Sequence, residues 1–363
     1  IVTSGLSMLI TRFIADRIYE RKYEEIITTY YGSLMLILPI AALIAIVFLW
    51  GVEENIYYKF VAYIYFIELV VIWMQNVFLS ALKDYKRIFR DFFIAVLLSV
   101  LTSFLLFYFT SWDPVIIALL GIDVGFASIL ILSSLHFEHV FPRSKKQNYF
   151  DFFKIIKTYP GIVFSGMCVY SGVYIHNIVY WLFSEEKFLI SGQYLLMPFY
   201  DVAVFYAYLS VLPSLIFFVV IIETDFYEKF LNYYKNVING GTYESLQTAK
   251  KKMEKVLLHR TGFLAEIQLL FTTLSIAIGV LLLPRIGFSM EQLDLFITLC
   301  FAYFFFILMF VLLHILMYFD DRKGVLAISA SFIGLSALLT YVTMLYDFHG
   351  MGMFLASFIG LAI

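Results

Sequence analysis

Ionisable and polar side chains occur inside long apolar runs of this 363-residue chain. Glu68 and Asp123 each lie near the middle of such a run, and His176 and Asn177 are adjacent inside a third run. A charged group on a helix surrounded by lipid is costly, so such residues usually face a cavity or a partner helix. We therefore name these four residues as candidates for lining a transport cavity or for coupling transport to a cation. The alternative is a hydrogen bond between packed helices, with the carboxyl groups protonated.

Three further ionisable residues, Asp201, Glu266 and His314, lie nearer the ends of apolar runs, and for these three and for His176 the packing role is favoured. Motifs for enzyme chemistry do not stand out. The sequence has no GxxxxGK[ST] phosphate-binding loop, which excludes ATP hydrolysis by that route. His136 and His139 in the segment HFEH can in principle share a metal ion, but a third ligand is not evident. We predict neither a metal nor another cofactor.

The runs that carry these residues have the length and composition of membrane helices. Hydrophobic residues make up 62% of the chain and charged residues 14%, whereas a soluble domain is about half apolar and a quarter charged. A bilayer core about 30 Å thick requires about 20 apolar residues per helix. Nine runs reach that length, at 30–50, 59–82, 92–110, 114–135, 160–183, 199–222, 261–283, 292–319 and 325–346. We predict an all-α polytopic membrane protein.

Two shorter apolar runs lie at the ends of the chain, before Thr11 and after Gly350. The first residue is Ile1 rather than Met, and the last run stops before it reaches a full span. We therefore expect a piece of a longer chain, with nine complete and two partial helices. The net charge of −2 gives no reason to expect a nucleic acid partner.

Basic residues alternate between the loops. All but three of the 25 lysines and arginines lie in every second loop, and basic loops remain on the cytoplasmic side of a membrane. The loops that we place in the cytoplasm are 11–25, 83–91, 136–159, 223–260 and 320–324. The loops on the other side are short, and their acidic pairs Glu53-Glu54 and Glu185-Glu186 have no catalytic domain around them. A membrane glycosyltransferase, which would bind a metal and activate an acceptor there, is therefore disfavoured.

The longest of these loops predicts a cytoplasmic amphipathic hairpin at 223–260. Aromatic residues recur at helical spacing along its first part, and Asn239-Gly240-Gly241 interrupts the pattern before Thr242, which can cap a second helix. Its lysines suit the anionic inner leaflet, but its acidic residues would lower membrane affinity, which slightly favours protein docking over lipid binding. The docking candidates are Glu223, Asp225, Phe226, Glu228, Phe230 and Tyr233.

Opposite charges also recur near the start of the chain. Arg12, Asp16 and Glu20 follow each other at intervals of four, with Arg17 and Arg21 beside them. This spacing forms ion pairs on the surface of a helix. We predict a solvated cytoplasmic juxtamembrane helix that includes Arg12, Asp16 and Arg17, and a role in gating is the alternative.

Four segments of the chain resemble one known family. They are TRFIADRIYE (11–20), YPGI (159–162), LPSLIFFVVIIETDFYEKF (212–230) and LYDF (345–348). The family is PelG, the inner-membrane transporter of Pel exopolysaccharide export, within the multidrug/oligosaccharidyl-lipid/polysaccharide flippase superfamily. The resemblance implies a flippase-like bundle of about twelve helices in two lobes. The N-terminal lobe would then be 1–135, the cytoplasmic inter-lobe loop 136–159 and the C-terminal lobe 160–363.

The resemblance also implies a function and partners. The substrate would be a Pel-like amino-sugar polymer, moved across the bacterial cytoplasmic membrane by alternating access or through a polymer-conducting cavity. A flippase for a lipid-linked oligosaccharide and a cation-coupled drug antiporter are the alternatives within the superfamily. The implied partners are a cytoplasmic glycosyltransferase, an inner-membrane Pel scaffold and a cyclic di-GMP receptor.

Overall fold

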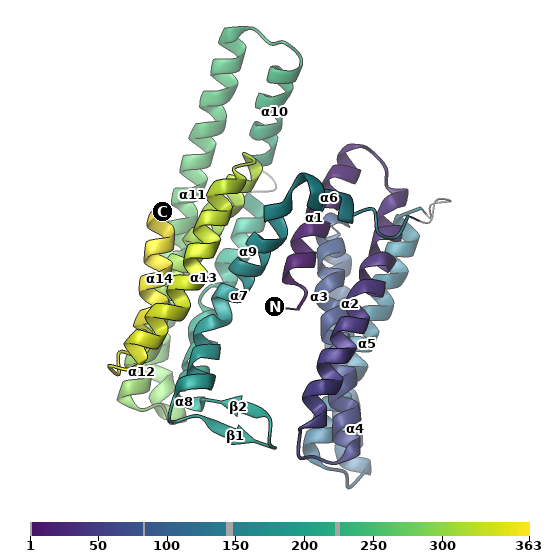
Figure 1. Cartoon of the computed structure of the whole chain (residues 1–363), viewed down its shortest axis with the longest axis vertical. Helices are drawn as coiled ribbons and strands as arrows, with labels where there is room; N and C mark the ends of the chain where they lie inside the picture. Colours follow the sequence, from purple (N-terminus) through teal and green to yellow (C-terminus); the bar gives the residue numbers. More distant parts are fainter. Residues whose placement is uncertain (1, 83, 143–147, 222–225) are drawn as a thin grey trace. The chain divides into compact units, whose positions relative to one another are not determined.

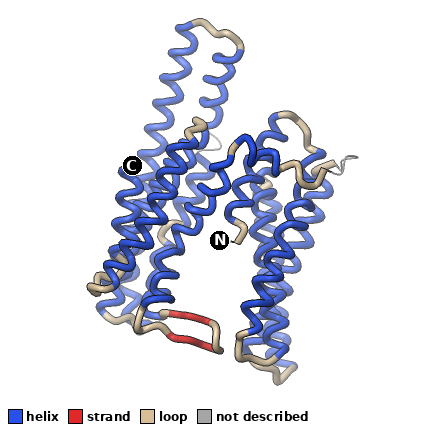
Figure 2. The backbone as a smooth tube through the Cα atoms, viewed as in Figure 1, coloured by secondary structure: helices blue, strands red, loops and turns tan. Residues whose placement is uncertain are grey.

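The structure is a computed structural model that describes residues 2–82, 84–142, 148–221 and 226–363. Helices dominate it, and the strands in the described residues form one short hairpin (Figure 2). Nine of the described helical segments are long and apolar enough to cross a membrane, and they coincide with the nine predicted runs. The all-α polytopic membrane fold is therefore confirmed.

The chain divides into two compact units, which are described separately. The first unit comprises residues 1–170 and 188–195, and the second comprises 171–187 and 196–363. The division falls within helix α7 (Pro160–Phe183), whose residues are shared between the units. The lobe boundaries at 135 and 160 that the family resemblance implies stay a prediction.

The first unit is built on tight packing between membrane helices. Its elements are α1 (Ser4–Tyr19), α2 (Glu24–Trp50), α3 (Ile56–Leu82), α4 (Tyr85–Phe109), α5 (Pro114–Val140), α6 (Phe153–Thr158) and most of the hairpin of β1 (Phe188–Ile190) and β2 (Tyr194–Leu196). Helix α5 begins where the Asp113 side chain accepts a hydrogen bond from the Val115 amide at 2.7 Å, and Pro114 suits its first turn. Buried residues of α1, α2, α3 and α5, among them Tyr30, Met74 and Phe78, form a common core.

The second unit contains the remaining elements (Figure 1). They are α8 (Pro198–Leu209), α9 (Leu212–Ile221), α10 (Tyr227–Ile238), α11 (Tyr243–Leu282), the short 3-10 helix η2 (Leu283–Ile286), α12 (Met290–Tyr318), α13 (Arg322–Met344) and α14 (Met351–Ala362). Helix α12 is largely buried within this unit. Its buried residues pack against α8, α11, α13 and α14, so it forms the centre of the unit.

The apolar run predicted at 199–222 is interrupted. Helix α8 ends at Leu209 and α9 begins at Leu212. Pro213 has no N–H group and therefore cannot bond to the carbonyl four residues earlier, which favours a break at this point. The carbonyl of Ser210, at the break, accepts a hydrogen bond from Gln268 Nε2 of α11 at 3.4 Å. A polar side chain from another helix thus compensates for the interrupted backbone.

Helix α11 joins two segments that the sequence pattern predicts as separate elements. Thr242 caps it by accepting a hydrogen bond from the Ser245 amide at 3.3 Å, as predicted. The helix then continues for 40 residues to Leu282, so the second helix of the hairpin and the predicted span 261–283 are one element. Helices α10 and α11 extend past the ends of α12 and α13 (Figure 1).

Candidate functional site

Glu68 of α3 and Asp123 of α5 come together in the first unit. Asp123 is only 6% exposed, and neither of its carboxyl oxygens has a hydrogen-bond partner among the described residues. Glu68 is half-buried, and its Oε2 likewise has no described partner. The two carboxyl groups are near enough to interact electrostatically. The structure therefore pairs two of the four residues that were named from the sequence.

Glycines on α5 position Asp123. A Cβ atom on Gly121 would lie 2.9 Å from the carbonyl oxygen of Ser99, and one on Gly125 would lie 2.9 Å from Ser99 Cβ. These two positions let α4 and α5 approach closely, as small residues do between membrane helices. Asp123 lies midway between the two glycines, about 200° from each around the helix, so it lies away from the α4 contact. Helix α3 packs against the same helix, and the rings of Tyr65 and Phe126 stack there at 5.7 Å.

A hydrogen-bond network lies further along α3. The Nε2 atom of buried Gln75 lies 2.9 Å from Tyr30 Oη, 3.1 Å from the Leu130 carbonyl oxygen and 3.0 Å from Ser134 Oγ. These contacts join α2, α3 and α5. Neither Tyr30 nor Ser134 was predicted from the sequence, because neither residue type is unusual in an apolar helix. Gln75 is a polar residue within an apolar run, and this was the one feature of the sequence that indicated a hydrogen-bond network here.

His176 and Asn177 are buried in the second unit. His176 is fully buried, and its Nδ1 lies 2.9 Å from the hydroxyl of Tyr200 on α8. Its Nε2 has no partner among the described residues. Asn177 donates a hydrogen bond to Asp201 Oδ1 at 3.0 Å. Both residues therefore link α7 to α8.

Asp201 is the centre of this link. Its carboxylate accepts hydrogen bonds from Trp181 Nε1 at 2.9 Å and from the Met197 amide at 2.9 Å, in addition to the bond from Asn177. The packing role that the sequence favours for Asp201 agrees with these contacts. Aromatic rings continue the cluster, since Tyr180 and Tyr200 stack at 3.8 Å.

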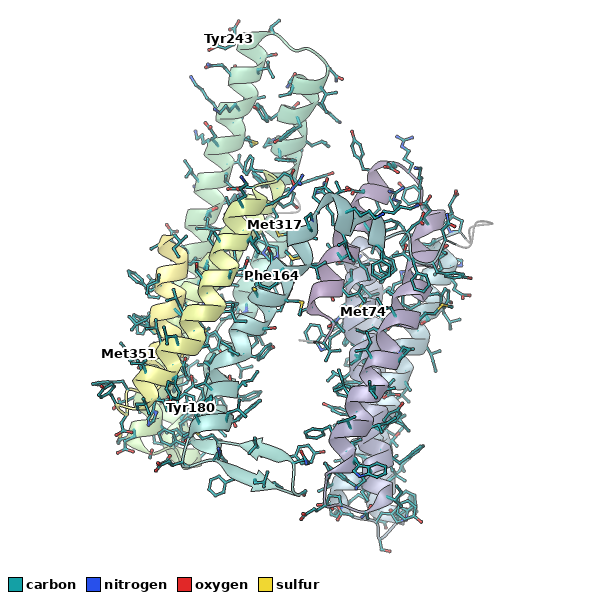
Figure 3. The ribbon with its side chains drawn as sticks, viewed as in Figure 1. Met74, Phe164, Tyr180, Tyr243, Met317 and Met351 are labelled. Atoms are coloured by element: carbon teal, nitrogen blue, oxygen red, sulfur yellow. The ribbon has the colours of Figure 1, made fainter. Side chains whose placement is uncertain are left out.

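Tyr180 extends the same cluster towards the loop before α14. Its hydroxyl lies 3.0 Å from His349 Nδ1, and Figure 3 marks its position. Neither residue was singled out from the sequence, because nothing near His349 in the chain indicates a buried partner. The second unit therefore holds a polar and aromatic cluster whose members are largely bonded to each other.

The two clusters differ in what they can do chemically. In the first unit, the carboxyl oxygens of Asp123 are available to bind a proton or a cation, or to accept a hydrogen bond from a hydroxyl group. In the second unit, the Asp201 carboxylate already has three donors. Among the described residues, no group of three His, Cys, Asp or Glu side chains is placed to hold a metal ion. The Glu68–Asp123 pair is therefore the stronger candidate for a site that binds and releases a proton or another ligand.

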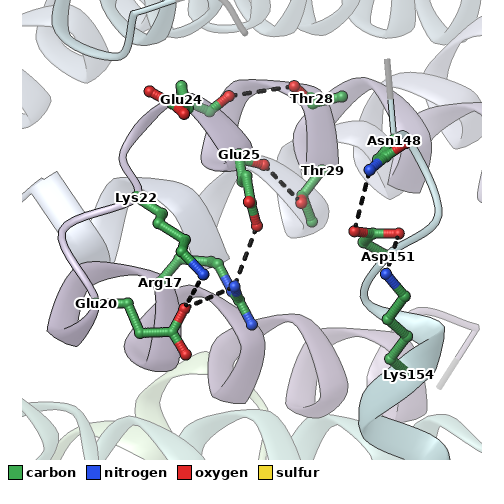
Figure 4. A network of polar contacts seen from close by, with 10 residues as sticks. All are labelled: Arg17, Glu20, Lys22, Glu24, Glu25, Thr28, Thr29, Asn148, Asp151 and Lys154. Carbon is green, nitrogen blue, oxygen red and sulfur yellow. Dashed lines mark hydrogen bonds and ion pairs between the residues drawn. The ribbon is translucent and has the colours of Figure 1, made fainter. Parts of the chain in front are cut away.

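The juxtamembrane residues form the predicted ion pairs in the first unit, and Figure 4 shows the pair of Arg17 with Glu20. Arg12 Nε lies 3.4 Å from Asp16 Oδ1, and Arg17 Nη1 lies 2.8 Å from Glu20 Oε2. Arg12 also donates a hydrogen bond to Tyr159 Oη at 3.2 Å. The hydrogen bond from Lys22, together with the Arg17 charge, holds the pKa of Glu20 below its usual value. Surface ion pairs of this kind contribute little to stability, so the bond to Tyr159 is the more specific contact.

The predicted docking residues have different environments. Glu223 and Asp225 lie outside the described residues. Phe226 is fully buried in a cluster with Met253 of α11 and Val311 of α12, and Phe230 and Tyr233 are partly buried against it. Glu228 is exposed. The aromatic stripe therefore holds the hairpin to its own unit, and Phe226 has no surface to offer to a partner.

Comparisons with known proteins agree with this fold. A model of the PelG family, described as an exopolysaccharide exporter (EPS-E), matches residues 1–363. A multidrug resistance MATE family transporter of the MOP superfamily, solved in an outward-facing conformation, has a TM-score of 0.58 and 15% sequence identity, over 99% of this chain and 80% of that chain. At this identity the likeness shows the fold alone. The comparison with curated proteins found no match.

Proposed function

The chain belongs to the PelG family of exopolysaccharide exporters, and on this basis we propose that it moves a Pel-like amino-sugar polymer across the bacterial cytoplasmic membrane. The observation that carries the proposal is the family match along all 363 residues on a transporter fold. Export as the class of function follows from the family, whereas the polymer and the membrane are the proposed part.

The Glu68–Asp123 pair supports a mechanism in which a buried group changes its partners during transport. In alternating access, a transporter moves between two states, and a ligand shifts their populations only by binding one state better. A carboxyl group with unsatisfied oxygens in a membrane helix can bind a proton or a cation in one state and release it in the other. We propose this role for Asp123, with Glu68 as the neighbouring carboxyl group that tunes it.

The partners proposed for this function are a cytoplasmic glycosyltransferase, an inner-membrane Pel scaffold and a cyclic di-GMP receptor. The glycosyltransferase would supply the polymer on the side where the basic loops lie. Polymerisation can push the chain outwards, or an ion gradient can supply the energy. A requirement for the Glu68–Asp123 pair would favour the ion gradient.

The MATE neighbour raises a second function. That neighbour is a multidrug resistance transporter, so a cation-coupled drug antiporter is the alternative with the same fold. The two functions differ in their substrate. Deleting the gene for this protein should abolish polymer secretion if the protein is an exporter. The deletion should sensitise the cells to cationic drugs if the protein is an antiporter.

The direct test uses the full chain in a host that lacks its own copy. We expect Glu68→Gln or Asp123→Asn to lower secreted polymer at least tenfold, measured as amino sugar in the culture supernatant, with unchanged protein abundance in the membrane fraction. Glu266→Gln is the control, because the structure leaves Glu266 of α11 exposed rather than packed as the sequence favoured. Normal secretion by both variants would leave the pair as packing residues. Normal secretion after deletion of the whole chain would refute export itself.

A further inference from the structure

The hairpin formed by α10 and α11 projects out of the membrane. A bilayer core about 30 Å thick accounts for about 20 residues of a helix, and the apolar part of α11 begins after Arg260. The eighteen residues from Tyr243 to Arg260 belong to the same helix and correspond to about 27 Å at 1.5 Å per residue. A hairpin continuous with a spanning helix extends away from the leaflet. Its tip, labelled at Tyr243 in Figure 3, is therefore remote from lipid.

The base of the hairpin is packed firmly against its own unit. Phe226 and Met253 are buried with Leu264, Val311 and Ile315. The ring of Phe226 contacts that of Tyr318 at 5.5 Å in an edge-on arrangement, and aromatic pairs of this kind add to the free energy of burial. The base of the hairpin is thus held in place by packing, and the outer ends of α10 and α11 project beyond it.

The tip of the hairpin carries exposed apolar side chains. Ile238, the last residue of α10, is 72% exposed, and Tyr243, the first of α11, is 77% exposed. Val237 beside them is also exposed. The Tyr243 hydroxyl accepts a hydrogen bond from Gln247 Nε2 at 2.7 Å, which orients the ring. We call Val237, Ile238 and Tyr243 the tip patch.

Polar and basic groups surround the tip patch. A groove of about 380 Å³ between α10 and α11 is lined by side chains that include Asn232, Asn236, Thr248 and Lys252. Residues 226–260 contain seven lysines and arginines but three acidic residues. Of the lysines at 250–255, Lys251, Lys252 and Lys255 form no ion pair with any described residue. The outer part of the hairpin therefore combines an apolar centre with hydrogen-bonding groups and positive charge around it, and an apolar centre within a polar rim is the arrangement of a protein interface.

We propose that the tip patch and the adjoining basic face of α11 dock a cytoplasmic protein with an acidic surface around an apolar pocket. The proposal depends on the membrane topology and stands whatever polymer the chain exports. Anionic lipid fits less well, because Lys251 is about 14 Å along the helix from Arg260, whereas the surface potential of an anionic leaflet decays over about 8 Å at physiological ionic strength. A second copy of this chain would bring two basic faces together, which is repulsive.

The first test is site-specific photo-crosslinking in intact cells that express the full chain. Benzoylphenylalanine replaces Ile238 or Tyr243, and in the control it replaces Leu258, which is equally exposed on α11 but close to the membrane. We expect a discrete protein adduct from the two tip positions and none from Leu258. Adducts with lipid alone, with a second copy of the chain, or of equal yield from Leu258 would overturn the proposal.

The second test measures affinity. The protein in the adduct, identified by mass spectrometry and purified, is titrated against the full chain in detergent. We expect Ile238→Glu/Tyr243→Glu to weaken binding at least tenfold. Lys250→Glu/Lys251→Glu/Lys252→Glu should do the same, whereas the matched arginine triple variant should bind normally. Unchanged affinity in both the tip variant and the lysine-to-glutamate variant would overturn the proposal. Because the tip substitutions lie outside the buried base, they remain decisive if the lysine variant fails to insert.

Discussion

Asp123 and Asp201 both lie within apolar runs but differ in their hydrogen bonds. Asp201 accepts bonds from Asn177, Trp181 and the Met197 amide. Asp123 accepts none from the described residues. A buried polar group without partners lowers stability, and such groups persist where a function requires them. The contrast separates a packing aspartate from one that is available to a ligand.

This contrast predicts opposite effects on stability. Asp201→Ala leaves three donors without an acceptor, and each buried unsatisfied group costs about 1–3 kcal/mol. We expect it to lower the melting temperature of the purified protein in detergent. Asp123→Ala leaves no described donor unsatisfied, so its melting temperature should be equal to or above that of the unmodified chain. Similar losses in the two variants would contradict this assignment of roles.

The helices are placed by residues that lie outside their hydrophobic pattern. Pro213 divides one apolar run into α8 and α9, and Thr242 begins a helix that continues from the cytoplasmic hairpin into the membrane. Gly352 lets α14 approach α13 so closely that a Cβ atom there would lie 2.3 Å from both N and Cα of Thr340. Single residues of these kinds decide where a helix ends and how near its neighbour lies.

Gly352 therefore provides a test of helix packing. Gly352→Ala places a methyl group against the backbone of Thr340, which cannot rotate away as a side chain can, and overpacking of this kind costs about 1–3 kcal/mol. We expect a lower melting temperature and less folded protein on size-exclusion chromatography. Gly334→Ala in α13 is the control, because no atom lies within 4 Å of the added Cβ. Equal stability of the two variants would show that α13 and α14 do not pack in this way.

The protein as a whole crosses the membrane many times, and its basic loops predict the orientation. Both native cysteines, Cys168 and Cys300, are free and buried, so an added surface cysteine can be labelled over a low background. This property makes the topology accessible to direct measurement in intact cells.

A cysteine at Asn148 or Glu244 should be protected from a membrane-impermeant maleimide, because both positions lie in loops that we place in the cytoplasm. A cysteine at Glu186, in an exposed loop that we place on the opposite side, should be labelled efficiently. Permeabilised cells serve as the control, since all three positions should then react. The reverse pattern at any one position would refute the orientation.

Several properties followed from the sequence alone. The nine spans were predicted correctly because the transfer of a helix into lipid depends on the composition of that one segment. The ion pairs of Arg12 and Arg17 followed from helical spacing, since their partners Asp16 and Glu20 lie within one turn. Glu68 and Asp123 were found as individual residues because a carboxyl group in an apolar run is conspicuous by itself.

Other properties appeared only in the tertiary structure. Helical spacing placed Phe226 on an apolar face, but the residues that cover this face, Val311 and Ile315, lie on a helix far along the chain. The hydrogen bonds of Asp201 and Gln75 likewise come from other helices. The protrusion of α11 depends on continuity between a polar and an apolar segment, which differ in hydropathy but not in helical geometry. Contacts between distant parts of a chain have no local signal, so only folding decides which polar atoms are satisfied and which stay available for function.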